Sequence, residues 1–259
     1  MRNVVLITGA SSGIGSSFAR LYGKERDLYL LGRNTTALEK LKEEIEKESG
    51  HSVYIQSIDL TLSDAPARVY EAVQENGLFV RTLINNAGFG TYGDFADGKV
   101  EDYKKMIDLN DRALVELTYL FLKDMQKEKK GEILNVASIA SFFPGPGMAV
   151  YYASKAFVLS FSRALHEEVR KQRITVSCLC PGPVSTNFAK TAGADQAKFF
   201  SSGLVHSPDQ VALYGKYLLD HKRSYGVEGF LNKTGVFLGR LLPSPLDARI
   251  LGFIQSLKK

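Results

Sequence analysis

The stretch Val4-Val5-Leu6-Ile7-Thr8-Gly9-Ala10-Ser11-Ser12-Gly13-Ile14-Gly15 decides the fold of this chain. Its first four residues are apolar and mostly β-branched, which predicts a strand covered on both faces. The glycines that follow let the backbone turn tightly into a helix that runs to about Tyr22. Free N–H groups at such a helix start face an anion. The stretch therefore predicts a phosphate site at the end of a buried strand.

The same turn also contains a rival motif. Residues 9–13 spell Gly-x-Ser-x-Gly, the nucleophile elbow of α/β-hydrolases. A hydrolase needs an acid and a histidine at later strand ends, and its elbow normally follows several strands rather than the first. None of the four histidines, at positions 51, 166, 206 and 221, falls in an evident strand-end motif. The phosphate-site interpretation is therefore preferred.

Strand and helix patterns alternate along the rest of the chain. Apolar runs predict further strands at 27–31, 53–58, 82–84, 133–137 and 174–179. Helices are expected from a capping box at 36–39, from Pro66 to about 74, from 100 to about 124, and from Tyr151 to about 171. With no linker, repeat or low-complexity segment, the pattern predicts an α/β fold. We expect one doubly wound Rossmann domain over residues 1–259, a central parallel sheet flanked by helices.

Composition excludes several classes of function. The 259 residues are 44% hydrophobic and 24% charged, and the net charge of +5 comes from scattered Lys and Arg. The short basic run at 127–130 fits a solvated loop, so no nucleic-acid partner is expected. Cys178 and Cys180 share one face of a strand, and Cys and His show no metal-ligand spacing. We expect reduced thiols, no metal, and a cytoplasmic protein, because no signal peptide or spanning run is apparent.

The end of the second strand carries Gly32-Arg33-Asn34, about 20 residues beyond the glycine turn. In a dinucleotide fold, this point meets the adenosine ribose, where a carboxylate selects NAD. Arg33 has no acid among its immediate neighbours in sequence, and a guanidinium suits a 2′-phosphate. NADP(H) is therefore preferred over NAD(H). At the end of the third strand, Asp59 could accept from the adenine amino group, or equally could serve a cap or turn.

A second functional group lies between residues 138 and 155. Tyr151 and Lys155 are four apart, so on a helix they share a face. An ammonium beside a phenol lowers its pKa, which makes a tyrosine usable in proton transfer near neutral pH. Ser138 ends an apolar run, so its hydroxyl is expected at the carboxyl end of a strand, where open parallel sheets bind ligands.

Taken in order, these motifs resemble the short-chain dehydrogenase/reductase family from Val4 to about Thr186. The glycine turn, Asn85-Asn86-Ala87-Gly88, Ser138, Tyr-x-x-x-Lys and Pro181-Gly182 all follow the family's order. The resemblance implies hydride transfer between NADP(H) and a carbonyl or secondary alcohol. It implies four catalytic residues: Asn110, which would help to place a relay water, Ser138, Tyr151 and Lys155. It implies a cofactor site of Gly9, Ser11, Ser12, Gly13, Ile14, Arg33, Asn34, Asp59, Leu60, Asn86, Ala87, Gly88, Tyr151, Lys155, Pro181, Val184 and Thr186.

An alternative function is a dinucleotide-binding sensor or scaffold without turnover. Such a protein would be expected to lose Ser138, Tyr151 or Lys155, and all three are present. The enzyme is therefore the preferred interpretation, and we expect a homodimer or homotetramer.

Aromatic residues around the expected pocket and the C-terminal part of the chain bear on substrate and location. The pocket is expected to be apolar, lined by Phe89, Phe142, Phe143, Met148 and Phe188, with Phe199, Phe200 and Leu204 in a substrate lid at about 184–207. This predicts a hydrophobic carbonyl or alcohol. An atypical C-terminal extension, about 231–259, carries Ile250, Leu251, Ile254 and Leu257 at helical spacing. Packing on the domain or on a second subunit is preferred over binding to a membrane surface, because the preceding prolines fix a bend.

Overall fold

A computed structural model describes residues 1–193 and 205–239, and within them seven parallel strands form one sheet in the order β3-β2-β1-β4-β5-β6-β7. The strands are β1 (Arg2–Thr8), β2 (Asp27–Gly32), β3 (Val53–Ser57), β4 (Leu78–Asn85), β5 (Gly131–Val136), β6 (Ile174–Cys180) and β7 (Tyr225–Val227). The predicted doubly wound Rossmann fold is confirmed, and every expected strand is present.

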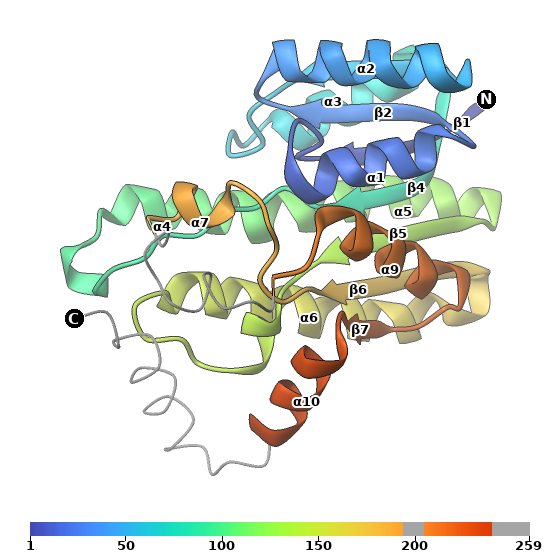
Figure 1. Cartoon of the computed structure of the whole chain (residues 1–259). Coiled ribbons are helices and arrows are strands. Elements are labelled where there is room, and N and C mark those ends of the chain that lie inside the picture. The colour runs from blue at the N-terminus through green and yellow to red at the C-terminus, as the bar shows by residue number, and fades with distance from the viewer. Residues whose placement is uncertain (194–204, 240–259) are drawn as a thin grey trace.

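Helices cover both faces of the sheet (Figure 1). One face carries α1 (Gly13–Gly23), α2 (Thr35–Ser49) and α9 (Pro208–Asp220), and the other carries α3 (Ala65–Glu75), α5 (Ala113–Glu128) and α6 (Ala149–Val169). Strand β1 shows why: Val4 and Leu6 pack into one core and Val5 and Ile7 into the other, all almost fully buried. The apolar run predicted this two-sided burial.

The winding of the chain reverses between β1 and β4. From β1 it passes outward to β2 and β3, then returns to place β4 on the other side of β1. Thr8 and Asn85 end these two strands, so the loops that follow them diverge and leave a crevice at the carboxyl edge. Open parallel sheets bind their ligands at such a reversal. The fold therefore places the glycine turn and the Asn86 loop side by side.

The expected single helix from 100 to about 124 is wrong in one respect. It consists of α4 (Val100–Ile107), a π-helical turn at Asp108–Arg112, and α5. A π turn inserts one residue and rotates the side chains within it. Here it brings the buried Asn110 against the backbone of Phe89. No proline or glycine marks the position, because the cause is this tertiary contact.

The start of α2 also differs from expectation. The predicted capping box began at Thr36, but the cap is Asn34, whose Oδ1 accepts from the Ala37 backbone N–H at 3.0 Å. Asparagine is among the strongest N-caps, so the helix begins two residues earlier. By contrast, Pro66 does lie in the first turn of α3, as predicted.

The remaining elements lie around the carboxyl edge and the end of the chain. Short 3₁₀ turns occur at Phe95–Asp97, Ile139–Phe142 and Arg170–Gln172, a short helix α7 spans Phe188–Thr191, and α10 spans Phe230–Gly239. Helix α10 buries Val236 but exposes Phe230, Leu231, Phe237 and Leu238. Residues 194–204 of the predicted lid and residues 240–259 of the C-terminal extension, including Ile250, Leu251, Ile254 and Leu257, lie outside the described residues. Across 1–193 and 205–239, no helix has the length and apolar character to cross a membrane.

Candidate active site

The turn after β1 has the backbone that its glycines permit. Gly9 and Gly13 take left-handed φ values of +67° and +55°, and a Cβ on Gly15 would collide with the Gly9 carbonyl oxygen. Helix α1 therefore starts directly against the end of β1, which brings its free N–H groups to the crevice. Its N-cap residue, Ser12, makes no side-chain cap hydrogen bond. The turn can accept a phosphate group as the sequence predicted.

Thr8 and Asn86 fasten this turn to the end of β4. Thr8 Oγ1 accepts from the backbone N–H groups of Asn86 and Ala87, both at 2.9 Å. Asn86 Nδ2 donates to the carbonyl oxygens of Thr8 at 2.9 Å and Gly9 at 3.3 Å. The two loops that border the reversal point are thus held as one unit before any ligand arrives.

The end of the crevice near β2 and β3, where the sequence predicts the adenosine and which is called the adenosine end below, is the more exposed one. Arg33 and Asn34 follow β2 and are exposed, and Asp59 and Leu60 follow β3. Asp59 Oδ1 accepts from the backbone N–H and the hydroxyl of Thr61 at 3.0 and 2.9 Å, which is the turn role left open by the sequence. Burial opposes ionisation of Asp59, but the Thr61 hydrogen bonds and the charge of Arg33 keep its pKa below the ordinary value. An acid therefore does lie near Arg33 in space, although none does in sequence.

The opposite end of the crevice holds the tyrosine, lysine and serine. Tyr151 lies in the first turn of α6 and Lys155 one turn later, with exposed fractions of 9% and 5%. Ser138 follows β5, and its Oγ accepts from the Ala140 backbone N–H at 3.1 Å, which fixes the hydroxyl at the start of a 3₁₀ turn. The Ser138 hydroxyl also hydrogen-bonds the Tyr151 phenol. The structure thus places Ser138, which follows β5, beside Tyr151 and Lys155 on α6.

The expected lowering of the phenol pKa by Lys155 is wrong. Burial raises the pKa of Tyr151 above its ordinary value, opposed by the Ser138 hydrogen bond rather than by the lysine. Lys155 Nζ donates to the Val136 carbonyl oxygen at 3.0 Å and lies 5.9 Å from the centroid of the Tyr151 ring. Burial also lowers the pKa of Lys155 to about 8, although the negative charge of Asp111 acts against this. Desolvation outweighs the pairing on which the sequence argument relied.

Asn110 lies behind this group and ties several parts of it together. Its Oδ1 accepts from the Phe89 backbone N–H at 3.1 Å, and its Nδ2 donates to the Phe89 carbonyl oxygen and to Ser154 Oγ, both at 3.0 Å. Ser154 Oγ in turn donates to the Tyr151 carbonyl oxygen at 2.8 Å. A Cβ on Gly88 would lie 3.0 Å from Asn110 Oδ1 and 3.2 Å from Lys155 Nζ, so these two groups border the same small space.

One cavity of about 410 Å³ runs from the exposed end to the buried end. Every predicted cofactor residue lines it, from Gly9 in the glycine turn to Thr186 after β6, and Ser138, Tyr151 and Lys155 line it as well. Asn110 does not reach its surface and acts from the second layer of side chains. The cavity therefore suits an extended ligand, with one end at the glycine turn and Arg33 and the other at Ser138, Tyr151 and Lys155.

The apolar wall near Tyr151 is partly as predicted. Phe89, Met148 and Phe188 line the cavity, and the Phe188 ring lies 5.3 Å from that of Tyr151. Phe142 and Phe143 do not line the cavity itself. Phe142 packs on the Tyr225 ring with centroids 6.3 Å apart. Phe143 lies between Gly239 and the cluster that contains Met148 and Tyr151, one layer behind the cavity wall. Phe199, Phe200 and Leu204 lie outside the described residues.

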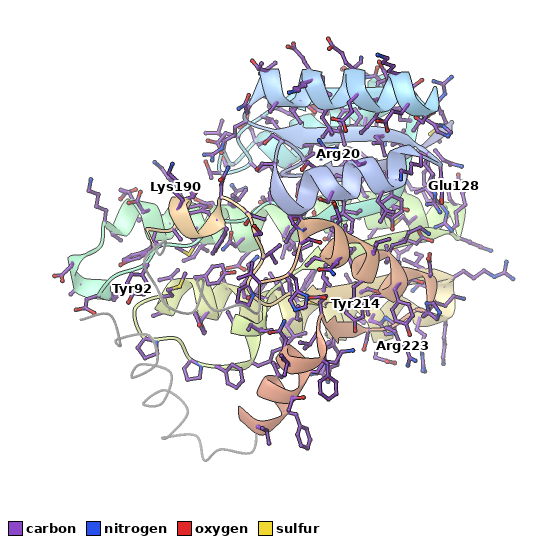
Figure 2. The ribbon with its side chains drawn as sticks, in the orientation of Figure 1. Arg20, Tyr92, Glu128, Lys190, Tyr214 and Arg223 are labelled. Carbon is purple, nitrogen blue, oxygen red and sulfur yellow. The ribbon has the colours of Figure 1, made fainter. Side chains whose placement is uncertain are left out.

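Two tyrosines at this end were missed in the sequence. Tyr92 and Tyr152 both line the cavity. Tyr92, labelled in Figure 2, lies in the segment after β4, and its backbone N–H donates to the carbonyl oxygen of Ala192, just after α7, at 2.9 Å. Adjacency to Tyr151 could have indicated Tyr152, whereas nothing in the pattern around Tyr92 does.

Comparison with known proteins accounts for this arrangement. Residues 3–197 match the family model described as short chain dehydrogenase. The chain belongs to the short-chain dehydrogenase family. Among curated relatives of this short-chain dehydrogenase, human 17-beta-hydroxysteroid dehydrogenase type 3 is 35% identical over 190 residues, covering 71% of this chain and 60% of that protein. Sulfoacetaldehyde reductase of Chromohalobacter salexigens is 38% identical over 201 residues, covering 76% of this chain and 79% of that protein.

A solved structure extends the likeness over nearly the whole short-chain dehydrogenase. The short-chain dehydrogenase from Sphingobium yanoikuyae in complex with NADPH superimposes with a TM-score of 0.82 at 29% identity, covering 94% of this chain and 97% of that chain. A nicotinamide dinucleotide also fits the residues found here. The close packing of α1 on the end of β1 at Gly15 and the helix start at Ser12 bring free backbone N–H groups to the cavity, where a pyrophosphate can bind.

Proposed function

We propose that this short-chain dehydrogenase transfers a hydride between NADP(H) and a hydrophobic carbonyl or secondary alcohol, with Tyr151 as the general acid and base. One observation carries the proposal. The glycine turn and Arg33 line one end of a single cavity, while Ser138, Tyr151 and Lys155 converge on an apolar wall at its other end. Phosphate recognition and proton transfer therefore face the same extended ligand.

Each residue has a part that follows from its surroundings. The nicotinamide ring supplies or takes the hydride when the cofactor is bound. The raised pKa of Tyr151 keeps the phenol protonated at neutral pH, which is the form that can donate to a carbonyl oxygen during reduction. Ser138 would hydrogen-bond the same oxygen and stabilise charge as it develops. Lys155 would hold the nicotinamide ribose, and Asn110 would keep Phe89 and the first turn of α6 in place.

The preference for NADP(H) is supported at the adenosine end. Arg33 is exposed where a 2′-phosphate would lie, and its charge reaches Asp59 across the mouth of the cavity. The NADPH complex of the Sphingobium relative agrees with a phosphate partner at this end. A phosphate dianion attracts a guanidinium more strongly than a single carboxylate does, so we expect Arg33 to favour the phosphate.

A hydrophobic substrate is supported by Phe89, Met148 and Phe188. The relatives act on different substrate classes by name, because they include a hydroxysteroid dehydrogenase and a reductase of a small sulfonated aldehyde. The homodimer or homotetramer and the cytoplasmic location stay predictions, and the buried free thiols of Cys178 and Cys180 suit a reducing compartment.

A carbonyl panel tests the proposal directly. Purified protein is mixed with NADPH or NADH and with cyclic ketones, aromatic aldehydes, medium-chain 3-oxo esters and sulfoacetaldehyde, and loss of the reduced cofactor is followed by absorbance. We expect turnover with an apolar carbonyl, faster with NADPH than with NADH. Tight NADPH binding without turnover of any carbonyl or alcohol would instead identify a sensor or scaffold.

A further inference from the structure

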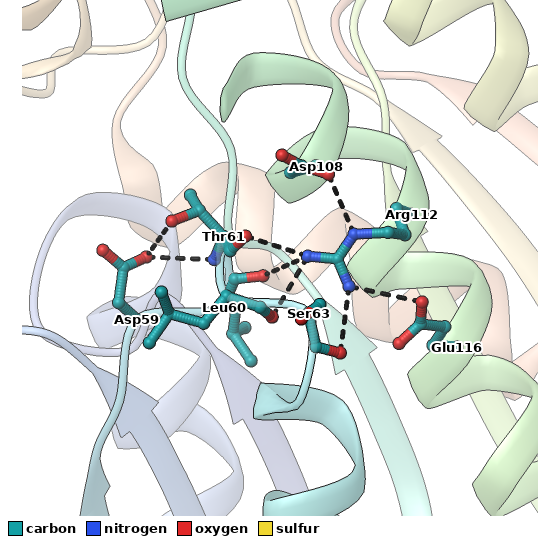
Figure 3. A network of polar contacts seen from close by, with 8 residues as sticks. Asp59, Leu60, Thr61, Ser63, Asp108, Arg112 and Glu116 are labelled. Atoms are coloured by element: carbon teal, nitrogen blue, oxygen red, sulfur yellow. Dashed lines mark hydrogen bonds and ion pairs between the residues drawn. The ribbon is translucent and has the colours of Figure 1, made fainter. Parts of the chain in front are cut away.

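Arg112 joins two parts of the cavity that have different tasks (Figure 3). Its guanidinium donates to four consecutive backbone carbonyl oxygens in the loop after β3: those of Leu60 at 3.4 Å, Thr61 at 3.0 Å, Leu62 at 3.1 Å and Ser63 at 3.4 Å. Within its own helical segment, the guanidinium donates to the carboxylates of Asp108 at 2.9 Å and of Glu116 at 3.2 Å. The planar fork of donors is therefore shared between the loop and the helix.

The loop at 59–63 is the floor of the adenosine end. Asp59 and Leu60 line the cavity, and the Asp59 carboxylate folds the loop back on Thr61. Its carbonyl oxygens accept hydrogen bonds from Arg112, as Figure 3 shows. Any ligand that fixes Asp59 and Leu60 therefore fixes the carbonyls that Arg112 holds.

On the helix side, Arg112 ends the π turn that carries Asn110. Asn110 holds the Phe89 backbone at the apolar end, and through Ser154 it reaches the backbone of Tyr151. The described contacts thus form an unbroken path of hydrogen bonds and one π turn from the adenosine floor to the first turn of α6. The π turn departs from regular α-helix geometry, as single-turn insertions at functional sites often do.

We propose that Arg112 is a positioning residue that couples occupancy of the adenosine end to the placement of Asn110 and Tyr151. The proposal rests on the proposed dinucleotide function and deepens it. Adenosine binding orders the loop, the loop holds Arg112, and Arg112 holds the π turn in the form that keeps Asn110 on Phe89. The adenosine half of the cofactor then promotes chemistry that takes place at the other end of the cavity.

A purely local role for Arg112 predicts something else. Its ion-pair partners Asp108 and Glu116 each lie four residues from it on the same helical segment. These pairs would stabilise that segment without any contact to the loop. Such a role lowers stability but leaves the two ends independent. Only the contacts with the loop, which join positions 49 to 52 residues apart, give coupling.

Hydrogen exchange of the intact protein separates these roles without any carbonyl substrate. Adenosine 2′,5′-bisphosphate is the probe, and Arg112→Met is compared with Arg68→Met. Arg68 is an exposed residue of α3 whose ion pair, among the residues that the structure describes, is with Asp64 at 3.6 Å. We expect the probe to slow exchange at 59–64 and at 107–113 in wild type and in Arg68→Met, but at 59–64 alone in Arg112→Met. Equal slowing of 107–113 in Arg112→Met would overturn the coupling, as would slowing confined to 59–64 in wild type.

Turnover with a divided cofactor gives the second readout. Reduced nicotinamide mononucleotide lacks the adenosine half of the cofactor. Adding adenosine 2′,5′-bisphosphate supplies that half as a separate molecule. We expect the probe to raise turnover about fivefold or more in wild type, a common size for coupling between two sites, and not in Arg112→Met. Activation in Arg112→Met equal to wild type contradicts the proposal.

Two further outcomes complete the test. If Arg112→Met does not fold, Arg112→Lys keeps the charge but not the fork, and it must then show reduced activation and reduced slowing at 107–113. If the probe binds and slows both segments in wild type while no carbonyl is turned over, the coupling stands and the proposed reaction fails. A probe that slows no segment of the wild type contradicts the dinucleotide site, and the coupling falls with it.

Discussion

The two ends of the cavity differ in how their polar groups are prepared for a ligand. At the nicotinamide end, Tyr151 and Lys155 are almost fully buried, and their polar atoms already pair with Ser138 and with the Val136 carbonyl. At the adenosine end, Arg33 is exposed, and the Asp59 side chain is occupied mainly in shaping its own loop. One end is desolvated and rigid, whereas the other is open to water.

This difference sets the size of what each group can contribute. Removing a charge or a proton donor from a water-excluded site strongly changes the free energy of the folded state or of the transition state, because the effective dielectric constant there is low. An exposed guanidinium acts through water and salt, and its contribution is correspondingly smaller. Substitutions at the buried end should therefore change rates and stability far more than substitutions at the exposed end.

The largest effect is expected for Tyr151→Phe. Without the phenol hydroxyl the proposed proton donor is lost, so turnover should fall by about 100- to 10,000-fold, the usual contribution of general acid–base catalysis. NADPH binding, measured by cofactor fluorescence, should change little. Tyr119→Phe, an exposed tyrosine on α5, is the matched control and should retain turnover. Near-normal turnover in Tyr151→Phe would show that another group supplies the proton.

A smaller but still large effect concerns the pH dependence of stability. The pKa of Lys155 is about 8 in the folded chain and 10.5 for an unperturbed lysine, so between these values the unfolded chain holds a proton that the folded chain lacks. Stability must then rise with pH across this window. We expect the unfolding free energy of wild type, taken relative to Lys155→Met, to increase by about 3 kcal/mol from pH 8 to 10.5 in urea melts without cofactor. A constant difference would show that burial does not penalise the ammonium.

The smallest effect is expected at the exposed end. Arg33→Asp replaces a phosphate partner with a like charge, and we expect the ratio of NADPH to NADH dissociation constants to shift by about tenfold toward NADH, which is about 1.4 kcal/mol. Added salt should weaken this preference. Arg170→Asp, the same charge reversal at the far end of α6, controls for net charge. An unchanged ratio in Arg33→Asp would mean that the 2′-phosphate does not meet this residue.

At the nicotinamide end, the sequence predicted the positions of the residues but not their pKa values. The glycine turn, Ser138 and the Tyr-x-x-x-Lys pair follow from local patterns, so their convergence on one cavity could be predicted from the strand ends. The pKa of Tyr151 could not, since desolvation depends on everything packed around it. The π turn and the Arg112 contacts were also out of reach, because they depend on pairs such as Arg112 and Leu60 that lie 52 residues apart.

A crystal structure with bound NADP⁺ tests the central claim most directly. The account predicts one dinucleotide along the whole cavity, with its pyrophosphate at the glycine turn, its nicotinamide beside Tyr151 and Ser138, and its 2′-phosphate within hydrogen-bond distance of Arg33. A dinucleotide lying in the opposite direction, or a nicotinamide ring out of reach of Tyr151, would contradict it.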